Sequence, residues 1–310
     1  MPKSSGLLLG VLRRHQAALL KRPGVVGVGL GLMVKNGKRT RDVGLRVLVR
    51  SPDVALPEEM EGVPIQAVVV GNVRANGTAR VRPLEGGLSF SQAGVGSYGT
   101  MGAVVADAAG SAMALTSFHV LAPACALSTS ANVYQPATFD GGSEVVGSVA
   151  RWYFHPGSAG ATGIDAAVAR IPAEVPINFT IEDYGAITGL ASAALGETIS
   201  KVGRTTNQTF GVVTNLSTTI ALAFDFGNKT FFNQVEVTVT SPSTEIAASG
   251  DSGAVWVNSS GKVVAVHMAA NSAGTIAYAN PIHAVRDRLS FTFQSPATAE
   301  SSRTFRVRAD

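Results

Sequence analysis

The sequence has almost no cysteine, and this scarcity narrows the classes of protein it can belong to. Cys125 is the only cysteine among 310 residues, so no disulfide can form within the chain. A chain of this length buries enough surface to fold without disulfides, and their absence fits a reducing compartment. The five histidines show no pair at the spacing of metal ligands, and we find no phosphate-binding loop. We therefore expect neither a metal nor a cofactor.

Long apolar runs are also missing. The apolar residues 6–12 are followed at once by Arg13, Arg14 and His15, so the run is too short for a membrane span or a signal peptide. It predicts instead an amphipathic helix that ends near Pro23. We expect a cytoplasmic protein that does not contact membranes.

Charge is sparse and evenly spread. Charged residues make up 15% of the chain, and the net charge is +4. The densest basic cluster, residues 35–41, surrounds Asn36 and Gly37, a pair that is typical of a hairpin turn between two strands. A solvated hairpin tip explains this cluster better than a nucleic-acid surface does, so we expect no nucleic-acid partner.

Glycine and apolar residues are abundant, with 34 glycines and 45% hydrophobic residues, which predicts a strand-rich globular protein. Residues 1–85 predict a small α/β unit, and the Gly- and Ser-rich residues 86–99 predict a linker. In residues 100–294, short apolar runs punctuated by turn residues predict an all-β sandwich or barrel, closed by a helix that Asn280 caps. The polar residues 295–310 predict a disordered tail. The runs interpreted as strands are 103–105, 113–116, 145–152, 166–171, 198–202, 210–216, 235–240, 254–257, 263–268 and 276–279.

One turn between two apolar runs has the composition of a nucleophile loop. Residues 249–253 read Ser-Gly-Asp-Ser-Gly. The backbone N–H groups of Gly250 and Ser252 could converge on one point and bind an oxyanion, while the Ser252 hydroxyl supplies a nucleophile. Gly250 permits the backbone geometry, and Gly253 leaves room beside the hydroxyl. A serine hydroxyl also needs a base, and the base needs an orienting acid.

The base and the acid are found by their position on predicted strands. His119 follows the apolar strand in "ALTSFHV", which would place its side chain at the rim of a barrel. The residues alone leave three acids open, Asp140, Asp165 and Asp183. Asp165 begins the buried strand "IDAAVARI", where a charge is costly unless it has a partner.

The blocks "ALTSFHV", "IDAAVARI" and "SGDSGAVWV" resemble, in this order, the three signature blocks of the chymotrypsin/trypsin-like serine peptidases. The stretches "KVGRTTNQTFGVV", "FNQVEV" and "ANPI" further resemble bacterial trypsin-like peptidases with an N-terminal extension, of which the plant narrow-leaf proteins are distant members. The resemblance implies a mainly β protein, a chymotrypsin-like double six-stranded β-barrel with a small N-terminal α/β extension and a C-terminal helix. It implies His119 as general base, Asp165 as its orienting acid and Ser252 as nucleophile, with Gly250 and Ser252 forming the oxyanion hole.

Two positions depart from the family pattern. In zymogens of the family, a freed N-terminus pairs with the acid before the nucleophile, here Asp251. This chain shows no obvious activation site, so Asp251 needs another partner or the enzyme is made active. Met268 stands where relatives usually offer a serine to the catalytic acid.

The resemblance places the substrate pocket on Ile246, Ala247, Ser249 and His267. Ile246 replaces the acid that holds Lys or Arg in trypsin-type enzymes, which disfavours basic residues at the cleaved position. His267 resembles the histidine with which glutamyl endopeptidases bind a substrate carboxylate, and an imidazole can donate to such a group. An idle, hydrogen-bonded strand histidine is the other interpretation. We expect an apolar or acidic residue at the cleaved position.

These residues together predict a serine endopeptidase that cleaves protein or peptide substrates through an acyl-enzyme. Two alternatives stay open. The first is a catalytically weak protease-fold module for binding or assembly, and the second is a narrow self-processing protease that cuts within residues 86–99. The N-terminal extension also leads us to expect a homo-oligomer.

Overall fold

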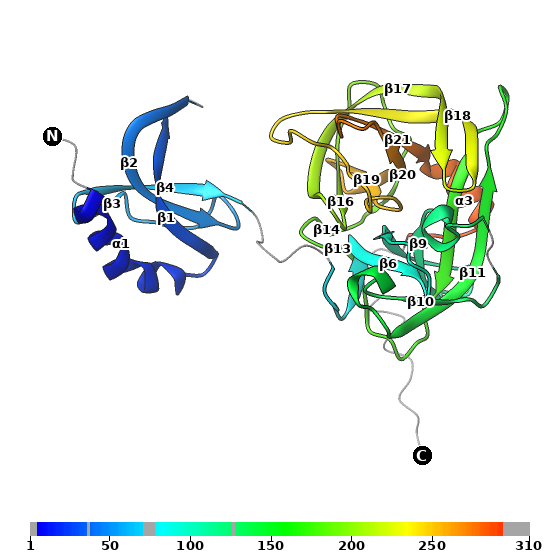
Figure 1. Ribbon diagram of the computed structural model, residues 1–310, viewed down its shortest axis with the longest axis horizontal. Helices are drawn as coiled ribbons and strands as arrows, with labels where there is room; N and C mark the ends of the chain where they lie inside the picture. Colours follow the sequence, from blue (N-terminus) through cyan, green and yellow to red (C-terminus); the bar gives the residue numbers. More distant parts are fainter. Residues whose placement is uncertain (1–4, 36–37, 71–77, 126–127, 294–310) are drawn as a thin grey trace, which may run out of the picture. The chain divides into compact units, whose positions relative to one another are not determined.

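The computed structural model describes residues 5–35, 38–70, 78–125 and 128–293, which form two compact units (Figure 1). The first unit is Met1–Arg74 and the second is Ala75–Asp310. The turn expected at residues 36–37 and the tail expected at 295–310 lie outside the described residues. Within the described part of the chain, none of the helices has both the length and the apolar character that crossing a bilayer requires.

The first unit packs one helix on a four-stranded sheet, in the order β1-β2-β4-β3. Its elements are α1 (Ser5–Leu20), β1 (Val25–Lys35), β2 (Lys38–Val49), β3 (Glu59–Met60) and β4 (Val63–Val69). β1 and β2 are antiparallel, as expected of hairpin strands, whereas β2 and β4 run parallel. Leu8 and Val11 of the helix pack with Leu45 and Val63 of the sheet, so helix and sheet share one small core.

The first barrel of the second unit is a seven-stranded sheet in the order β7-β6-β10-β11-β12-β9-β8. Its strands are β6 (Leu88–Gln92), β7 (Gly99–Met101), β8 (Ala103–Ala106), β9 (Ala112–Thr116), β10 (Asn132–Tyr134), β11 (Val145–His155) and β12 (Ile164–Arg170). β7 and β8 follow each other in the chain and are separated only by Gly102. Because they lie at opposite ends of the strand order, this segment links the two ends of the sheet. A Cβ at Gly102 would lie 2.1 Å from the carbonyl oxygen of Gly253, so only glycine fits there.

The second barrel has the strand order β15-β20-β19-β16-β17-β18-β21, and a further pairing of β20 with β21 closes it. Its strands are β15 (Gly189–Leu190), β16 (Thr198–Gly203), β17 (Asn207–Phe224), β18 (Gly227–Val239), β19 (Val255–Asn258), β20 (Lys262–Ala270) and β21 (Ile276–Pro281). β17 and β18 form a hairpin that extends well beyond its barrel partners, which leaves its tip available to contact other parts of the unit.

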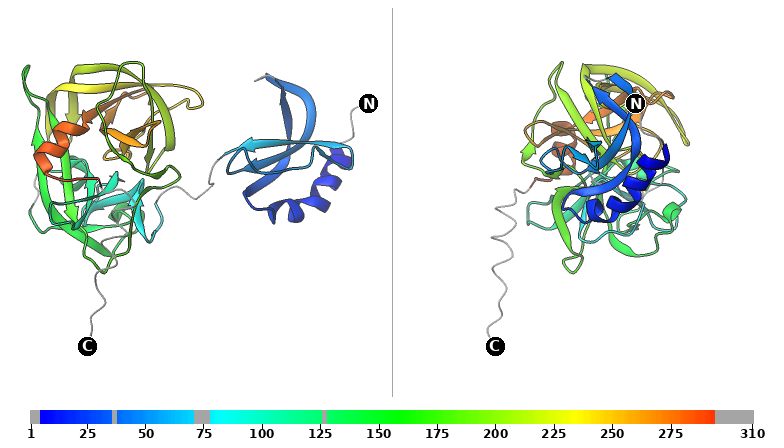
Figure 2. Two further views of the ribbon diagram at one scale, coloured as in Figure 1. Left: turned by 180° about the vertical axis from the view of Figure 1, so that it is seen from behind. Right: turned by 90° about the vertical axis from the view of Figure 1, so that its left-hand side faces the viewer.

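Three apolar clusters hold the second unit together, one inside each barrel and one between them. The cluster between the barrels includes Ile282, Val285 and Leu289 of the C-terminal helix α3 (Ile282–Leu289), drawn in orange in Figure 2. A small third sheet flanks the barrels, and it consists of β5 (Leu84–Gly86), β13 (Ile177–Ile181) and β14 (Gly185–Ala186). The mainly β, chymotrypsin-like double barrel expected from the sequence is confirmed.

Two local expectations need correction. The linker expected at 86–99 belongs to the first barrel, because β6 pairs with β7 and β10. Two of its three serines are buried. The hydroxyls of Ser89 and Ser91 accept hydrogen bonds from the backbone N–H groups of Ala137 and Thr138, each at 3.0 Å. Asn280 does not cap α3; it lies buried in β21, and Pro281 occupies the cap position.

Candidate active site

His119 and Asp165 lie together at the mouth of the first barrel. His119 is on a four-residue helix, α2 (Phe118–Leu121), that follows β9, and Asp165 is the second residue of β12. The His119 Nδ1 atom lies 2.5 Å from Asp165 Oδ2, and the His119 backbone N–H donates to Asp165 Oδ1 at 3.1 Å. Because an ionised carboxylate only accepts hydrogen bonds, Nδ1 carries the proton, and Nε2 is left as an acceptor.

The environment of His119 raises the pKa of its imidazole. Burial alone would lower the pKa of the imidazole, but the charge and hydrogen bond of Asp165 and the charge of Asp225 raise it above its usual value. Asp165 is fully buried, and its backbone N–H donates to the Asn280 side-chain oxygen at 3.0 Å. Of the other two acids left open by the sequence, Asp140 pairs with Arg204, and Asp183 lies at a turn with a φ of 58°.

The Ser252 loop comes from the second barrel, just before β19. Gly250 has a φ of 101°, a left-handed value that side chains rarely allow. Neither the Gly250 nor the Ser252 backbone N–H donates a hydrogen bond to any described residue. The Ser252 hydroxyl donates to the Met268 carbonyl oxygen at 3.2 Å. The loop therefore carries a hydroxyl and two backbone donors that are available to a bound substrate.

Thr100 of the first barrel ties this loop in place. Its backbone N–H donates to the Ser252 carbonyl at 2.8 Å, and its hydroxyl donates to the Gly250 carbonyl at 2.9 Å. The same hydroxyl accepts the Arg204 backbone N–H at 2.9 Å. Thr100 is fully buried, so these bonds fix the loop against the barrel that carries His119.

Asp251, between the oxyanion-hole candidates, has a fully buried ion pair. The Lys201 ammonium lies 3.0 Å from its Oδ2 atom, and neither side chain is exposed. The Thr206 hydroxyl donates to the same oxygen at 2.6 Å. Burial would raise the Asp251 pKa, but Lys201 and the Thr206 and Ala248 hydrogen bonds outweigh it and lower the pKa to about 2. Lys201 is thus the partner that the sequence left unassigned.

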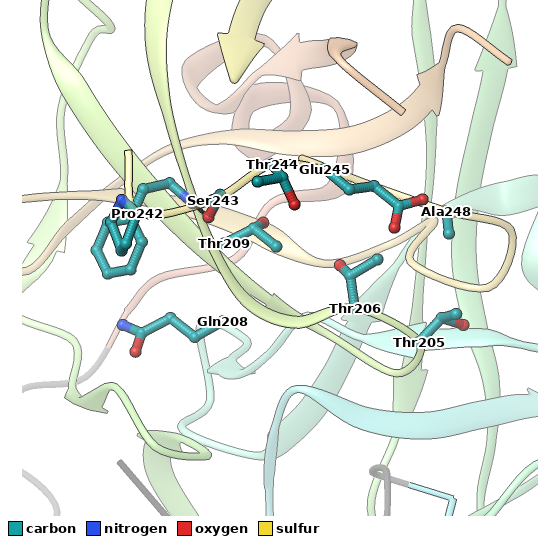
Figure 3. A pocket seen from close by; sticks show the side chains of 10 residues that line it. Thr205, Thr206, Gln208, Thr209, Pro242, Ser243, Thr244, Glu245 and Ala248 are labelled. Carbon is teal, nitrogen blue, oxygen red and sulfur yellow. Dashed lines mark hydrogen bonds between the residues drawn. The ribbon is translucent and has the colours of Figure 1, made fainter. Parts of the chain in front are cut away.

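Thr205, Thr206 and Ala248 also line a separate cavity of about 420 Å³ beside this ion pair (Figure 3). Its other lining residues are Gln208, Thr209, Phe210, Pro242, Ser243, Thr244 and Glu245. The backbone N–H groups of Thr205 and Thr206 donate to Asp251 Oδ1, at 2.9 and 3.1 Å. The cavity therefore lies beside the buried Asp251 contacts that hold the Ser252 loop, and Ser252 itself does not line it.

His119 and Ser252 both line one larger cavity of about 660 Å³. One part of its wall is the β17–β18 hairpin tip, residues 221–226, and another is the end of β20, residues 268–270. The remaining lining residues are Gly96, Ser97, Tyr98, Pro123, Ser249 and Gly250. The predicted base and nucleophile therefore line one cavity, and the predicted acid lies buried behind the base, hydrogen-bonded to its ring.

The predicted substrate-pocket residues are mostly not in this cavity. Ser249 lines it, whereas Ile246 and Ala247 are buried in the core of the second barrel. His267 is only 1% exposed, its Nδ1 atom has no hydrogen-bond partner among the described residues, and its ring lies edge-on to Trp256. Burial first, and the Lys201 charge second, lower the pKa of His267 to about 3, so the ring is neutral.

Three parts of the candidate site were not predicted from the sequence: Lys201, Thr100 and the hairpin tip. Lys201 carried a signal, since a lysine within the apolar strand at 198–202 is costly to bury without an acid partner. Thr100 and the hairpin tip carried none, because their importance depends on contacts with segments more than a hundred residues away.

Comparison with known proteins assigns this arrangement to a family. The family model described as Trypsin matches residues 69–289. Since this match covers more than half of the chain, the chain belongs to the trypsin family of serine endopeptidases. No curated protein sequence matched the chain.

Several solved bacterial protease structures share the fold. Protease A of Thermobifida fusca is 20% identical with a TM-score of 0.51, covering 68% of this chain and 98% of that one. The Nocardiopsis protease NAPase is 16% identical with a TM-score of 0.51, at the same coverages of 68% and 98%. A glutamic acid specific serine protease, described as using a histidine triad in substrate binding, is 22% identical with a TM-score of 0.51 and coverages of 68% and 100%.

Proposed function

We propose that the protein is a serine endopeptidase in which His119, Asp165 and Ser252 form the catalytic triad. The observation that carries the proposal is the His119–Asp165 hydrogen bond at the wall of a cavity that also contains Ser252. In the unbound enzyme the Ser252 hydroxyl donates to Met268, so catalysis requires it to turn toward His119 Nε2. Catalytic hydrogen bonds are often long or absent until the substrate binds.

The reaction then follows from the chemistry of these groups. His119 Nε2 accepts the hydroxyl proton as Ser252 Oγ attacks the scissile carbonyl carbon. The N–H groups of Gly250 and Ser252 donate to the oxyanion that forms. The protonated imidazole, stabilised by Asp165, gives its proton to the leaving amine as the peptide bond breaks. Water then attacks the acyl-enzyme with the same base, releases the acid product and restores the hydroxyl.

At the cleaved position we propose a small to medium apolar residue. Ser249 and residues 268–270 offer an uncharged surface next to Ser252. A substrate carboxylate would need a donor, and the expected donor, His267, is buried and neutral. Of the two classes that the sequence leaves open, burial of His267 therefore favours the apolar one over the acidic one.

Labelling with a fluorophosphonate tests the activity, and a peptide library tests the specificity. We expect the wild-type chain to be labelled and the Ser252→Ala variant not to be. A well-folded but unlabelled wild type would contradict the proposal and favour a binding module. Two fragments that appear only when Ser252 is intact would indicate self-processing. Strong cleavage after Lys or Arg would overturn the apolar pocket. Assembly through the first unit and a cytoplasmic location stay predictions.

A further inference from the structure

The hairpin tip next to His119 is anchored by aromatic side chains and so has a defined position. The Phe224 and Phe226 rings stack with centroids 5.1 Å apart. Phe154 of the first barrel packs edge-on to both, at 5.6 and 5.4 Å, and Phe231 packs on Phe154 at 5.6 Å. Aromatic pairs of this geometry add to the burial of apolar area. The second barrel's hairpin is thereby fastened to the strand that pairs with Asp165.

The tip touches the catalytic imidazole from the side. The Phe224 ring centroid lies 5.5 Å from that of His119, and the two rings meet edge to face. β17 ends at Phe224 and β18 begins at Gly227, whose φ of 108° lets the chain reverse direction. Asp225 is therefore the first residue of a two-residue turn, immediately beside the ring that contacts His119.

Among the described residues that line the active-site cavity, Asp225 is the only Asp, Glu, Lys or Arg. It is exposed, and its carboxylate forms no ion pair or hydrogen bond with any described residue. Lys229, the nearest basic residue along the hairpin, does not pair with it. Apart from this carboxylate, the only titratable side chain of ordinary pKa near neutrality among the described lining residues is His119. A carboxylate without an ion-pair partner in such a cavity attracts cations, and the neighbouring phenylalanine rings would add a cation–π contact.

We propose that Asp225 is a specificity-determining residue that selects a basic side chain next to the cleaved residue of the substrate. This inference rests on the proposed function. It assigns the basic side chain to a neighbouring position because the hairpin tip flanks His119, whose ring must face the scissile bond. The side chain of the cleaved residue itself would lie against Ser249 and residues 268–270, where no charge is found.

The test uses the full chain and a peptide library randomised at the positions flanking a fixed apolar cleaved residue. We expect Lys and Arg to be enriched at one flanking position, with kcat/KM about threefold to tenfold above that of Gln there. Because the pair is exposed, raising the salt concentration should reduce the preference. Asp225→Asn should abolish it, and Asp225→Lys should reverse it toward Asp and Glu.

Glu174→Gln is the matched control, because it removes an exposed carboxylate that does not line the cavity. It should leave the preference unchanged. A preference that survives Asp225→Asn, or active enzyme that shows no basic preference at any flanking position, overturns the inference alone. Absence of both peptide cleavage and fluorophosphonate labelling would overturn the proposed function as well, so the two failures can be told apart.

Discussion

Each barrel buries one carboxylate near the active site, and the two carboxylates have different partners. Asp165 of the first barrel meets the His119 imidazole, whose charge changes with its protonation. Asp251 of the second barrel meets Lys201, a permanent cation, and several further donors. An ionised carboxylate that is paired with a permanent cation stabilises the folded structure. One whose partner is titratable can also stabilise a charge that appears during a reaction. The contrast predicts that their loss has different consequences.

The largest expected effect is on catalysis, at Asp165. Asp165→Asn keeps the shape of the side chain but lets it donate to Nδ1, which fixes the wrong imidazole tautomer. We expect kcat to fall by about 10⁴-fold. Thermal unfolding followed by circular dichroism should change little relative to this loss. Steady-state kinetics with an active peptide substrate measures the effect, and a loss of less than tenfold would show that Asp165 is not the orienting acid.

Next comes stability, at Lys201. Lys201→Met leaves Asp251 buried without its cation, which we expect to lower the free energy of unfolding by about 3–5 kcal/mol. Denaturant titration measures this loss. The double variant Lys201→Met/Asp251→Asn removes both charges and should recover a large part of it. Lys262→Met, at an exposed strand end, is the control and should have little effect. Equal losses in the single and double variants would contradict the ion-pair explanation.

The sequence was sufficient to predict the barrels and to propose candidate site residues, because those signals are local. Turn residues bound each strand, His119 follows an apolar run, and Asp165 lies near the start of another. The nucleophile turn at 249–253 is likewise continuous in sequence. Physical requirements of this kind act on neighbouring residues, so they can be recognised before the fold is known.

The features that the sequence did not predict correctly, or left open, depend on contacts between distant segments. Ser89 and Ser91 suggested a linker, yet each hydroxyl accepts a backbone N–H from a segment some fifty residues further on. His267 could be either a pocket ligand or a core residue until its burial was known. The hairpin tip around Asp225 reads as an ordinary turn in the sequence. Composition could not distinguish a buried polar group from an exposed one at these positions.

The paired carboxylate also predicts how stability depends on pH. The pKa of Asp251 is lowered to about 2 in the folded protein, against about 3.9 for an unfolded chain. A lowered folded-state pKa stabilises above the unfolded value, and this contribution is lost as pH falls through the folded value. We expect a loss of about 2 kcal/mol between pH 4 and pH 2. Denaturant titrations across this range measure it, and the loss should be absent in the double variant Lys201→Met/Asp251→Asn.

The smallest expected effect is that of the Asp225 charge on the pKa of His119, the partner of Asp165. His119 must be neutral to act as a base, so its raised pKa moves the acid limb of the kcat/KM profile to higher pH. Asp225→Asn removes one of the charges that raise it, while the Asp165 hydrogen bond remains. The acid limb should therefore shift to lower pH, and Glu174→Gln should leave it in place. An unshifted limb in Asp225→Asn would mean that Asp165 alone sets the charge state of His119.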